Sequence, residues 1–518
     1  MFKNKRSGLW IVVVALTLAV ALAVPMFAGA AISTNDNPVN LVMTNPTEDC
    51  KTSMMINWHS PLAQCTISYT TADDTEFANA TTVNVDGVAG TLDYFDLKAG
   101  KYYKYAYTIT GLTEDTQYIY KISNTSGESA VYTFKTAGTN AFRFLSMGDT
   151  HADGGSRYTY VTQTTKMLNN VVKKIGAYDL IIFTGDYVQT GATYNNWVQW
   201  NDSQLTTSAV MSLTIGNHDT DNRDAGSKRI SNKWFVNSLS NPVNGPDGLE
   251  SVYWFNYNGV LFLCVDTLAP EMSEFTSAQK NLATQMQWMK DVAAAQEGKY
   301  QYIVVYQHNP YGLGSSDEMA SWSYYSQMYK ACDAIGADFV LGGDNHEYSR
   351  SNRLYNNQVV DAEGDVGSYY VTNPMVTSGS MNRVVEGSGL IATRYAGAGT
   401  GCTIFNVTEE SITMQLVNQA GKVIDEVSVP SRRDAVVVGT EVAGPAVSDD
   451  ATPTPAATAT PAPEATPEPG DEATPTSAPS DDNTAGDKGN NDIILPIVIC
   501  AAVVVVVAVV VVVVLKKK

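Results

Sequence analysis

The sequence predicts an α/β domain preceded by an all-β sandwich. Between residues 31 and 138, short stretches of alternating apolar and polar residues are separated by Asp, Asn, Gly and Ser, a pattern typical of antiparallel β structure. From residue 141 on, continuous apolar runs alternate with helical patterns, which indicates strands buried on both faces. The chain has 518 residues, and 44% of them are hydrophobic, so both domains can bury a core.

The N-terminal 30 residues have the pattern of a targeting segment. MFKNKR carries positive charge, residues 9–24 are apolar, and Ala28-Gly29-Ala30 is a small-x-small sequence. These three features predict a secretory signal peptide over residues 1–30, cleaved after Ala30. An uncleaved membrane anchor is the alternative interpretation.

The C-terminal segment is predicted to cross a membrane. Residues 493–515 are apolar without interruption, and a helix of that length spans about 35 Å, enough for a bilayer. The three lysines 516–518 predict a cytoplasmic tail. Residues 444–492, rich in Pro, Thr, Ala and acidic residues, predict an extended linker. We therefore expect an exported protein, anchored to the cell membrane, with its catalytic domain outside.

Composition excludes some classes of function. The net charge is −20, from 33 basic and 53 acidic residues, so no nucleic-acid-binding surface is expected. Six cysteines are too few for a disulfide scaffold. Cys50 and Cys65 are the one pair expected to form a bridge, and the absence of a C-x-x-C pair gives no support to a thiolate zinc site.

The first domain, residues 31–138, is expected to be structural. Trp58 on an early strand, the run 109–112 (ITGL) and the tyrosines of Thr116-x-Tyr118-x-Tyr120 resemble a fibronectin type III module. A packed Trp and a corner Tyr are structural features. His59 follows Trp58, so by alternation it is expected on the opposite face, exposed to solvent.

The second domain, residues 141–430, has polar residues at the ends of its predicted strands. A helix is predicted where Leu282, Met286 and Met289 recur at helical spacing, and a hairpin where SVYWFNYNG precedes VLFLCVDT. Because ligands bind at the carboxyl edge of α/β sheets, the residues that follow the apolar runs are candidates for a site. In chain order these are Asp149-Thr150-His151, Gly185-Asp186, Gly216-Asn217-His218-Asp219, His308-Asn309-Pro310 and Gly343-Asp344-Asn345-His346.

Four of the five histidines of the chain lie in these motifs. Imidazole, carboxylate and amide oxygen are ligands of borderline and hard divalent metals. A single Gly-Asp or Asn-His is usually only a turn or a loop. Five such motifs together favour a metal site.

The ordered series D-x-H, G-D, G-N-H-D, H and G-x-x-H resembles the calcineurin-like metallophosphoesterase superfamily over about residues 141–430. The β-sandwich ahead of it, His308-Asn309-Pro310 and the run 346–350 (HEYSR) resemble more narrowly the purple acid phosphatase branch. The resemblance implies a four-layer αββα sandwich and a hydrolase with two metal ions.

The resemblance also implies ligand roles. One metal ion would be held by Asp149, His151, Asp186 and His346, and the other by Asp186, Asn217 and His308, with Asp186 bridging them. His218 would face the phosphate as a catalytic residue, with Asp219 orienting it. Asn309, Tyr348 and Arg350 are the expected substrate contacts.

Two positions depart from the family pattern. Gln189 stands where purple acid phosphatases carry a tyrosine ligand, so no purple colour is expected. Asp344 stands where the last motif usually has its first histidine. The expected cofactors are two ions of Fe, Mn or Zn, with Mn or Fe favoured beside Asp344 because a carboxylate is a hard ligand.

The sequence therefore predicts an acid phosphatase-like enzyme whose metal-bound hydroxide attacks the phosphorus of a phosphorylated small molecule. Two alternatives stay open. One is a phosphodiesterase or nucleotidase of the same fold. The other is a surface protein that binds phosphorylated ligands without hydrolysing them, its site having decayed at Asp344.

Overall fold

A computed structural model describes residues 39–88, 102–153, 158–201, 209–220, 231–310 and 325–445, apart from 363, 377–380, 382, 388 and 396–398. The predicted signal peptide (1–30), nearly all of the predicted linker (444–492) and the predicted transmembrane segment (493–515) lie outside the described residues. Among the residues described, no helix is both long and apolar enough to cross a membrane.

The larger of two stacked sheets has nine strands and contains the first three predicted strands of the α/β domain. β9, β10 and β11 are parallel, and β22 and β23 continue the sheet as antiparallel strands. In order across the sheet, the strands are β24 (Val423–Pro430), β23 (Ser411–Asn418), β22 (Gly401–Val407), β9 (Phe142–Met147), β10 (Leu180–Phe183), β11 (Val210–Leu213), β1 (Asn40–Asn45), β2 (Ser53–Ser60) and β5 (Tyr103–Thr110).

The second sheet has eight strands, and its centre is again parallel. The predicted hairpin is present at one edge as an antiparallel pair. In order, the strands are β12 (Tyr253–Tyr257), β13 (Val260–Cys264), β14 (Tyr302–Tyr306), β15 (Phe339–Gly342), β19 (Tyr369–Thr372), β16 (Tyr348–Ser351), β21 (Ile391–Tyr395) and β20 (Val385–Glu386). A separate pair is formed by β17 (Leu354–Tyr355) and β18 (Gln358–Val359).

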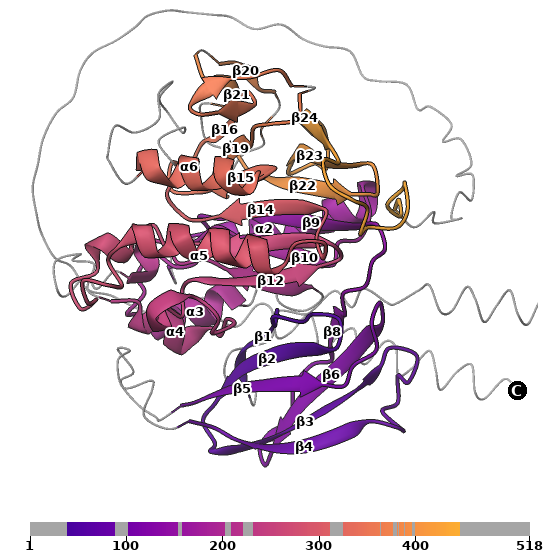
Figure 1. The fold of residues 1–518 in the computed structure, drawn as a ribbon. Helices are drawn as coiled ribbons and strands as arrows, with labels where there is room; N and C mark the ends of the chain where they lie inside the picture. Colours follow the sequence, from indigo (N-terminus) through magenta and orange to yellow (C-terminus); the bar gives the residue numbers. More distant parts are fainter. Residues whose placement is uncertain are drawn as a thin grey trace, which may run out of the picture. The chain divides into compact units, whose positions relative to one another are not determined.

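Helices cover the outer face of each sheet, as Figure 1 shows. On β9, Phe144 packs between the sheets, whereas Leu145 packs outward with the helix residues Leu168 and Trp197. This alternation explains why both faces of each central strand are apolar. The helices beside the nine-stranded sheet are α2 (Tyr158–Lys174), α3 (Tyr194–Asn201) and α4 (Lys233–Ser238); those beside the other are α5 (Leu282–Ala295) and α6 (Tyr325–Ile335).

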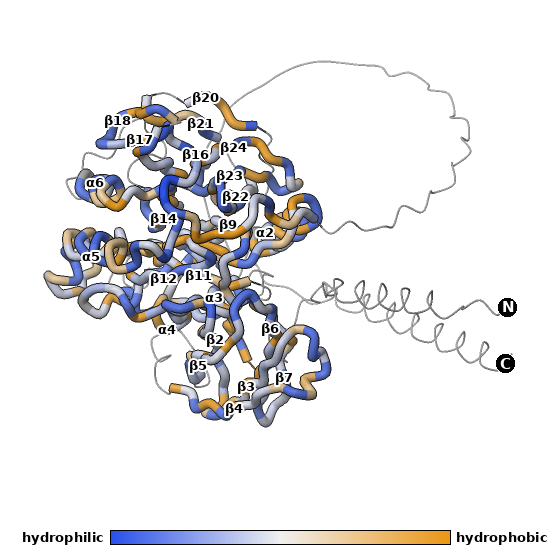
Figure 2. Tube along the Cα trace, turned by 45° about the vertical axis from the view of Figure 1, so that its right-hand side comes forward, coloured by the Kyte–Doolittle hydropathy of each residue, from blue (hydrophilic) through white to orange (hydrophobic). Residues whose placement is uncertain are grey.

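The predicted helix around Met286 and Met289 is α5, which carries both residues buried. Asn281 caps its first turn by accepting from the amide of Ala283. Figure 2 shows hydrophobic and hydrophilic residues mixed along this helix, as expected for a helix with one face against a sheet. Short 3₁₀ turns occur at η2 (His218–Thr220), η4 (Pro246–Gly248) and η5 (Ala269–Glu271).

The N-terminal region is a β-sandwich, but one half of it belongs to the nine-stranded sheet. β1 pairs in parallel with β11, so the strands of this half extend the sheet of the α/β domain. Trp58 on β2 stacks on Tyr105 of β5 at 4.7 Å within a core that both halves share. The other half consists of β3 (Gln64–Thr71), β4 (Thr81–Asp86), β6 (Gln117–Asn124), β7 (Gly127–Glu128) and β8 (Tyr132–Lys135).

This shared sheet corrects the prediction for His59. The side chain points away from Trp58 as expected, but it is fully buried because that face of β2 is covered by α3. Its Nδ1 lies 3.1 Å from the hydroxyl of Tyr194, the first residue of α3, and the two rings are stacked. The expectation of a solvated histidine was therefore wrong.

The predicted Cys50–Cys65 bridge is not present in the structure. Both cysteines are buried free thiols in the same core. Cys50 donates to the carbonyl of Thr47, and burial raises the pKa of its thiol to about 12. Each therefore acts as a small apolar side chain of the core.

Candidate metal centre

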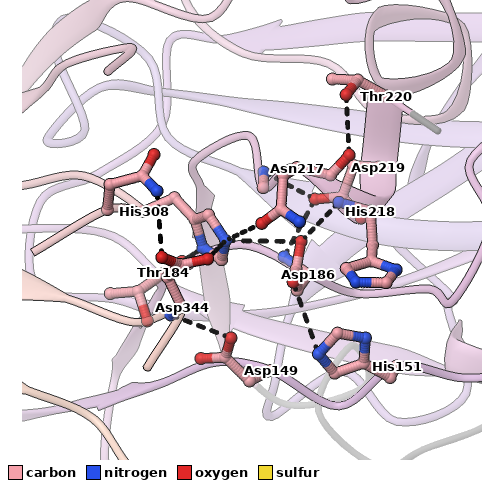
Figure 3. Close-up of polar contacts among 12 residues, drawn as sticks. Asp149, His151, Thr184, Asp186, Asn217, His218, Asp219, Thr220, His308 and Asp344 are labelled. Atoms are coloured by element: carbon pink, nitrogen blue, oxygen red, sulfur yellow. Dashed lines mark hydrogen bonds and ion pairs between the residues drawn. The ribbon is translucent and has the colours of Figure 1, made fainter. Parts of the chain in front are cut away.

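The five sequence motifs meet at the carboxyl ends of parallel strands from both sheets. Asp149 and His151 follow β9, Asp186 follows β10, and Asn217 and His218 follow β11. From the second sheet, His308 follows β14, and Asp344 and His346 follow β15. Figure 3 shows the side chains of Asp149, His151, Asp186, Asn217 and His308 gathered around one centre.

One cluster consists of two aspartates and two histidines. One ligand atom each from Asp149, His151, Asp186 and His346 lies within 4.8 Å of the others. The Nε2 atoms of His151 and His346 are 3.0 Å apart, and Nε2 of His151 is 3.4 Å from Oδ2 of Asp186. Such a set of nitrogen and oxygen donors fits a borderline divalent or trivalent cation.

A second group of donors surrounds His308. Nδ1 of His308 lies 2.7 Å from the carbonyl of Thr184, to which it donates. Nε2 then faces three oxygen atoms: Oδ1 of Asn217 at 2.8 Å, and Oδ1 of Asp186 and of Asp344 at 3.5 Å each. A neutral imidazole would turn its lone pair toward these oxygens, so a positive charge is needed between them.

The pKa values reflect crowded negative charge. Burial would raise the pKa of Asp186, but His308 and His151 outweigh it and hold that pKa well below its ordinary value. Burial raises the pKa of Asp149 well above its ordinary value, and the carboxylates of Asp186 and Asp344 add to this, against the effect of His308. Oδ2 of Asp149 is buried and has no hydrogen-bond partner among the described residues. A bound cation would supply that partner, so the residues fit a metal centre.

The backbone at the centre is strained. Five of the candidate ligand residues have φ between +46° and +66°, a region that residues other than glycine rarely adopt, at a cost of about 1–2 kcal/mol each. Strain concentrated in this way is typical of functional sites. The five residues are Asp149, His151, Asp186, Asp344 and His346.

Two glycines of the motifs are required by close approach. A Cβ atom on Gly216 would lie 2.2 Å from both the backbone nitrogen and Oδ1 of Asp186. A Cβ atom on Gly343 would lie 2.5 Å from Oδ2 of Asp149. Only glycine at these positions leaves room for the two carboxylates.

Asp219, predicted to orient His218, binds the backbone of two loops. Its carboxylate accepts from the backbone amides of Asp186 (3.0 Å), Tyr187 (3.0 Å) and Gly216 (2.8 Å). It therefore holds together the two loops that carry the metal ligands, and it is fully buried.

His218 contacts Gln189, whose part in the site the sequence did not reveal. Nδ1 of His218 lies 3.0 Å from both the carbonyl oxygen and the side-chain amide of Gln189. The backbone nitrogen of His218 donates to Oδ1 of Asp186 at 2.8 Å. The ring of His218 packs edge-on against that of His151, with centroids 4.5 Å apart, so His218 borders the first cluster.

The predicted substrate contacts fall into two groups. Asn309 lies at the centre, but its amide nitrogen donates to Asp344 (3.1 Å) and its oxygen accepts from Thr267 (3.1 Å). Tyr348 and Arg350 are turned toward β24, where both bind Asp425, the arginine through two bonds of 2.8 and 3.0 Å. The structure does not bring these last two residues to the centre, because Asp425 satisfies their polar groups.

Thr267, which contacts Asn309, was not among the predicted site residues. The run Asp266-Thr267 follows β13 in the same manner as the recognised motifs follow their strands, so its position could have indicated its part in the site. Thr184 acts only through its carbonyl oxygen, which no side-chain pattern reveals.

Comparison with known proteins agrees with this fold and site. The calcineurin-like phosphoesterase family model matches residues 142–348, and the purple acid phosphatase N-terminal domain model matches residues 37–136. A comparison with curated proteins finds no match.

Two solved structures share the fold at low identity. A purple acid phosphatase from yellow lupin (Lupinus luteus) seeds has a TM-score of 0.60 and 13% identity, over 77% of this chain and 75% of that one. A structure described as PhoD has a TM-score of 0.51 and 14% identity, over 78% of this chain and 94% of that one.

The fold and the cluster of donors define a hydrolase of phosphate esters with a candidate metal centre. The chain carries a calcineurin-like phosphoesterase domain preceded by a purple acid phosphatase N-terminal domain. The family resemblance of the sequence motifs is thereby confirmed.

Proposed function

We propose that this protein hydrolyses phosphate esters with the help of two cations bound side by side between its two sheets. The observation that carries the proposal is the 3.0 Å separation of the Nε2 atoms of His151 and His346, with Asp149 and Asp186 beside them. These residues come from the ends of β9, β10 and β15, so the fold brings them together at considerable cost in backbone strain.

The residues divide into two sets that share Asp186. Asp149, His151, Asp186 and His346 would hold one cation, and Asp186, Asn217, His308 and Asp344 the other. A pair of cations lowers the pKa of a bound water and withdraws negative charge from phosphoryl oxygens. The hydrogen bond from His308 to Thr184 fixes the imidazole so that Nε2 faces this second set.

His218 is the proposed catalytic side chain. In the tautomer whose Nδ1 accepts from the side-chain amide of Gln189, Nε2 of His218 carries the proton and can donate a hydrogen bond to a phosphoryl oxygen or a proton to the leaving group. The side chain of His346 is 42% exposed whereas those of His151 and Asp186 are each 1% exposed. The side of His346 is therefore the proposed entrance for substrate.

The two sets of donors differ in hardness. The set around Asn217 contains one imidazole and three oxygen donors, whereas the set around His151 contains two imidazoles. We therefore propose Mn²⁺ or Fe²⁺, which are harder cations, at the set around Asn217. The set around His151 would hold Fe, Mn or Zn.

The test is hydrolysis of p-nitrophenyl phosphate and its bis-ester by purified protein with Mn²⁺, Fe²⁺ or Zn²⁺ added. We expect hydrolysis by the wild type and a loss of at least about 100-fold in Asp186→Asn, since this residue serves both cations. If neither the wild type nor Asp186→Asn hydrolyses either ester with any metal, and the wild type still binds a phosphate ester, the protein is a non-catalytic binding protein instead.

We also propose that the protein is exported and held on the membrane by residues 493–515. The apolar character of that segment and the lysines after it support this. The full chain should then sediment with membranes, and a chain ending at residue 445 should be released into the medium. Release of both chains alike would refute the anchor.

A further inference from the structure

We propose that Asp344 is a specificity-determining residue that makes the site select phosphate esters carrying one negative charge, diesters above all, over dianionic monoesters. This inference rests on the proposed function and names the substrate class of the same site.

The carboxylate of Asp344 is held in place at the centre. Its Oδ1 is 3.5 Å from Nε2 of His308, and its Oδ2 accepts from the amide of Asn309 at 3.1 Å. Asn309 is held in turn by the hydroxyl of Thr267 at 3.1 Å. The backbone nitrogen of Asp344 donates to Oδ1 of Asp149 at 3.0 Å. The negative charge is therefore a permanent part of the site rather than a mobile surface group.

Asp344 changes the charge that a substrate meets. Together with Asp149 and Asp186, it would cancel three of the four positive charges that two divalent cations bring. A neutral histidine at this position would leave two positive charges uncancelled instead of one. Whatever the charge of the bound water, Asp344 leaves the centre one unit less positive than a neutral histidine would, and this disfavours a dianionic monoester more than a monoanionic diester.

The protein offers little compensation. Within the described part of the chain, no ion pair joins a lysine or arginine to the carboxylates of Asp149, Asp186 or Asp344. Arg350 was expected to contact the substrate, but its guanidinium donates two hydrogen bonds to Asp425. The carboxylates of the centre would therefore repel the additional negative charge of a monoester.

The first test measures binding rather than activity. Methyl phosphate and dimethyl phosphate are titrated at pH 8 into the full-length wild type loaded with Mn²⁺, because the monoester is a dianion and the diester a monoanion at that pH. In Asp344→Asn and Asp344→His, we expect affinity for methyl phosphate to rise about tenfold relative to dimethyl phosphate. Mn²⁺ content per chain is measured in each protein, and Asp344→His supplies a neutral ligand should the asparagine variant lose a cation.

The matched control is Asp291→Asn, which removes one carboxylate from the exposed face of α5 and should leave the ratio unchanged. An unchanged ratio in both Asp344 variants would overturn the proposal.

The second test separates this inference from the proposed function. At pH 8 the wild type should hydrolyse bis(p-nitrophenyl) phosphate in preference to p-nitrophenyl phosphate. The relative rate for the monoester should increase at pH 5, where a larger share of it is the monoanion. A wild type that hydrolyses both esters but prefers the monoester at pH 8 would overturn the inference alone. A wild type that hydrolyses neither, with any cation, would overturn the proposed function.

Discussion

Asp219 accepts a hydrogen bond of 3.0 Å from the backbone amide of Asp186, although the two residues are 33 positions apart. The same carboxylate binds the amides of Tyr187 and Gly216. It thus joins the loop after β10 to the loop after β11. The position of Asp186, the proposed bridging ligand, depends on this contact, and so does the spacing of the proposed cations.

Replacing Asp219 by alanine should lower the free energy of unfolding by about 3 kcal/mol, because buried amides lose their acceptor. Metal content should fall as well. Denaturant unfolding and metal analysis check both. A variant of normal stability and metal content, impaired only in turnover, would instead support a role in orienting His218.

Gly216→Ala should abolish metal binding at the centre, because the new methyl group would lie 2.2 Å from Oδ1 of Asp186. We expect a loss of stability of about 1–3 kcal/mol as the loop shifts. Metal analysis and thermal unfolding are the measurements. Gly444→Ala is the control and should behave as the wild type, since its added Cβ has no atom within 4 Å among the described residues apart from its chain neighbours.

Arg350→Ala should reduce stability far more than it changes KM. The guanidinium and Asp425 form a largely buried pair, with 12% and 10% of their side chains exposed, and removal of one partner from such a pair costs about 3–5 kcal/mol. Unfolding and steady-state kinetics are compared. A large rise in KM at unchanged stability would restore the role in substrate binding that the sequence predicted.

His59 should make the protein less stable in acid. Burial, and next the charge of Lys104, lower the pKa of its imidazole to about 3, so below pH 6.5 the unfolded chain binds a proton that the folded protein does not. Stability therefore falls as pH decreases from 6.5 toward 3, by about 2 kcal/mol at pH 5. Urea unfolding at pH 7 and pH 5 should show this decrease in the wild type and a smaller one in His59→Gln. Equal decreases in both proteins would contradict it.

Removal of cations should destabilise the wild type, because the carboxylates of Asp149, Asp186 and Asp344 then repel one another without compensation. Treatment with a chelator should lower Tm, and added Mn²⁺ should restore it in proportion to the logarithm of its concentration. Asp186→Asn should respond far less to either treatment. An identical response of the two proteins would place the cations elsewhere.

Local patterns in the sequence were sufficient to predict the elements that carry the site. Apolar runs such as FRFLSM and YQYIVVY, each followed by polar residues, predicted β9 and β14 and the donors behind them. This succeeded because a buried strand imposes its pattern on consecutive residues, and because the carboxyl ends of parallel strands lie at one edge.

The partners of individual side chains depended on contacts between distant segments. Arg350 and Asp425 are 75 positions apart, and nothing near either residue indicates the other. His59 is buried because β2 extends the sheet of the α/β domain beneath α3, whereas alternation alone predicts a face and not what covers that face. The sequence by itself thus determined which residues could bind metal and in what order. The register of the strands and the packing of the layers decided which residues face the centre, because these are set by the whole chain at once.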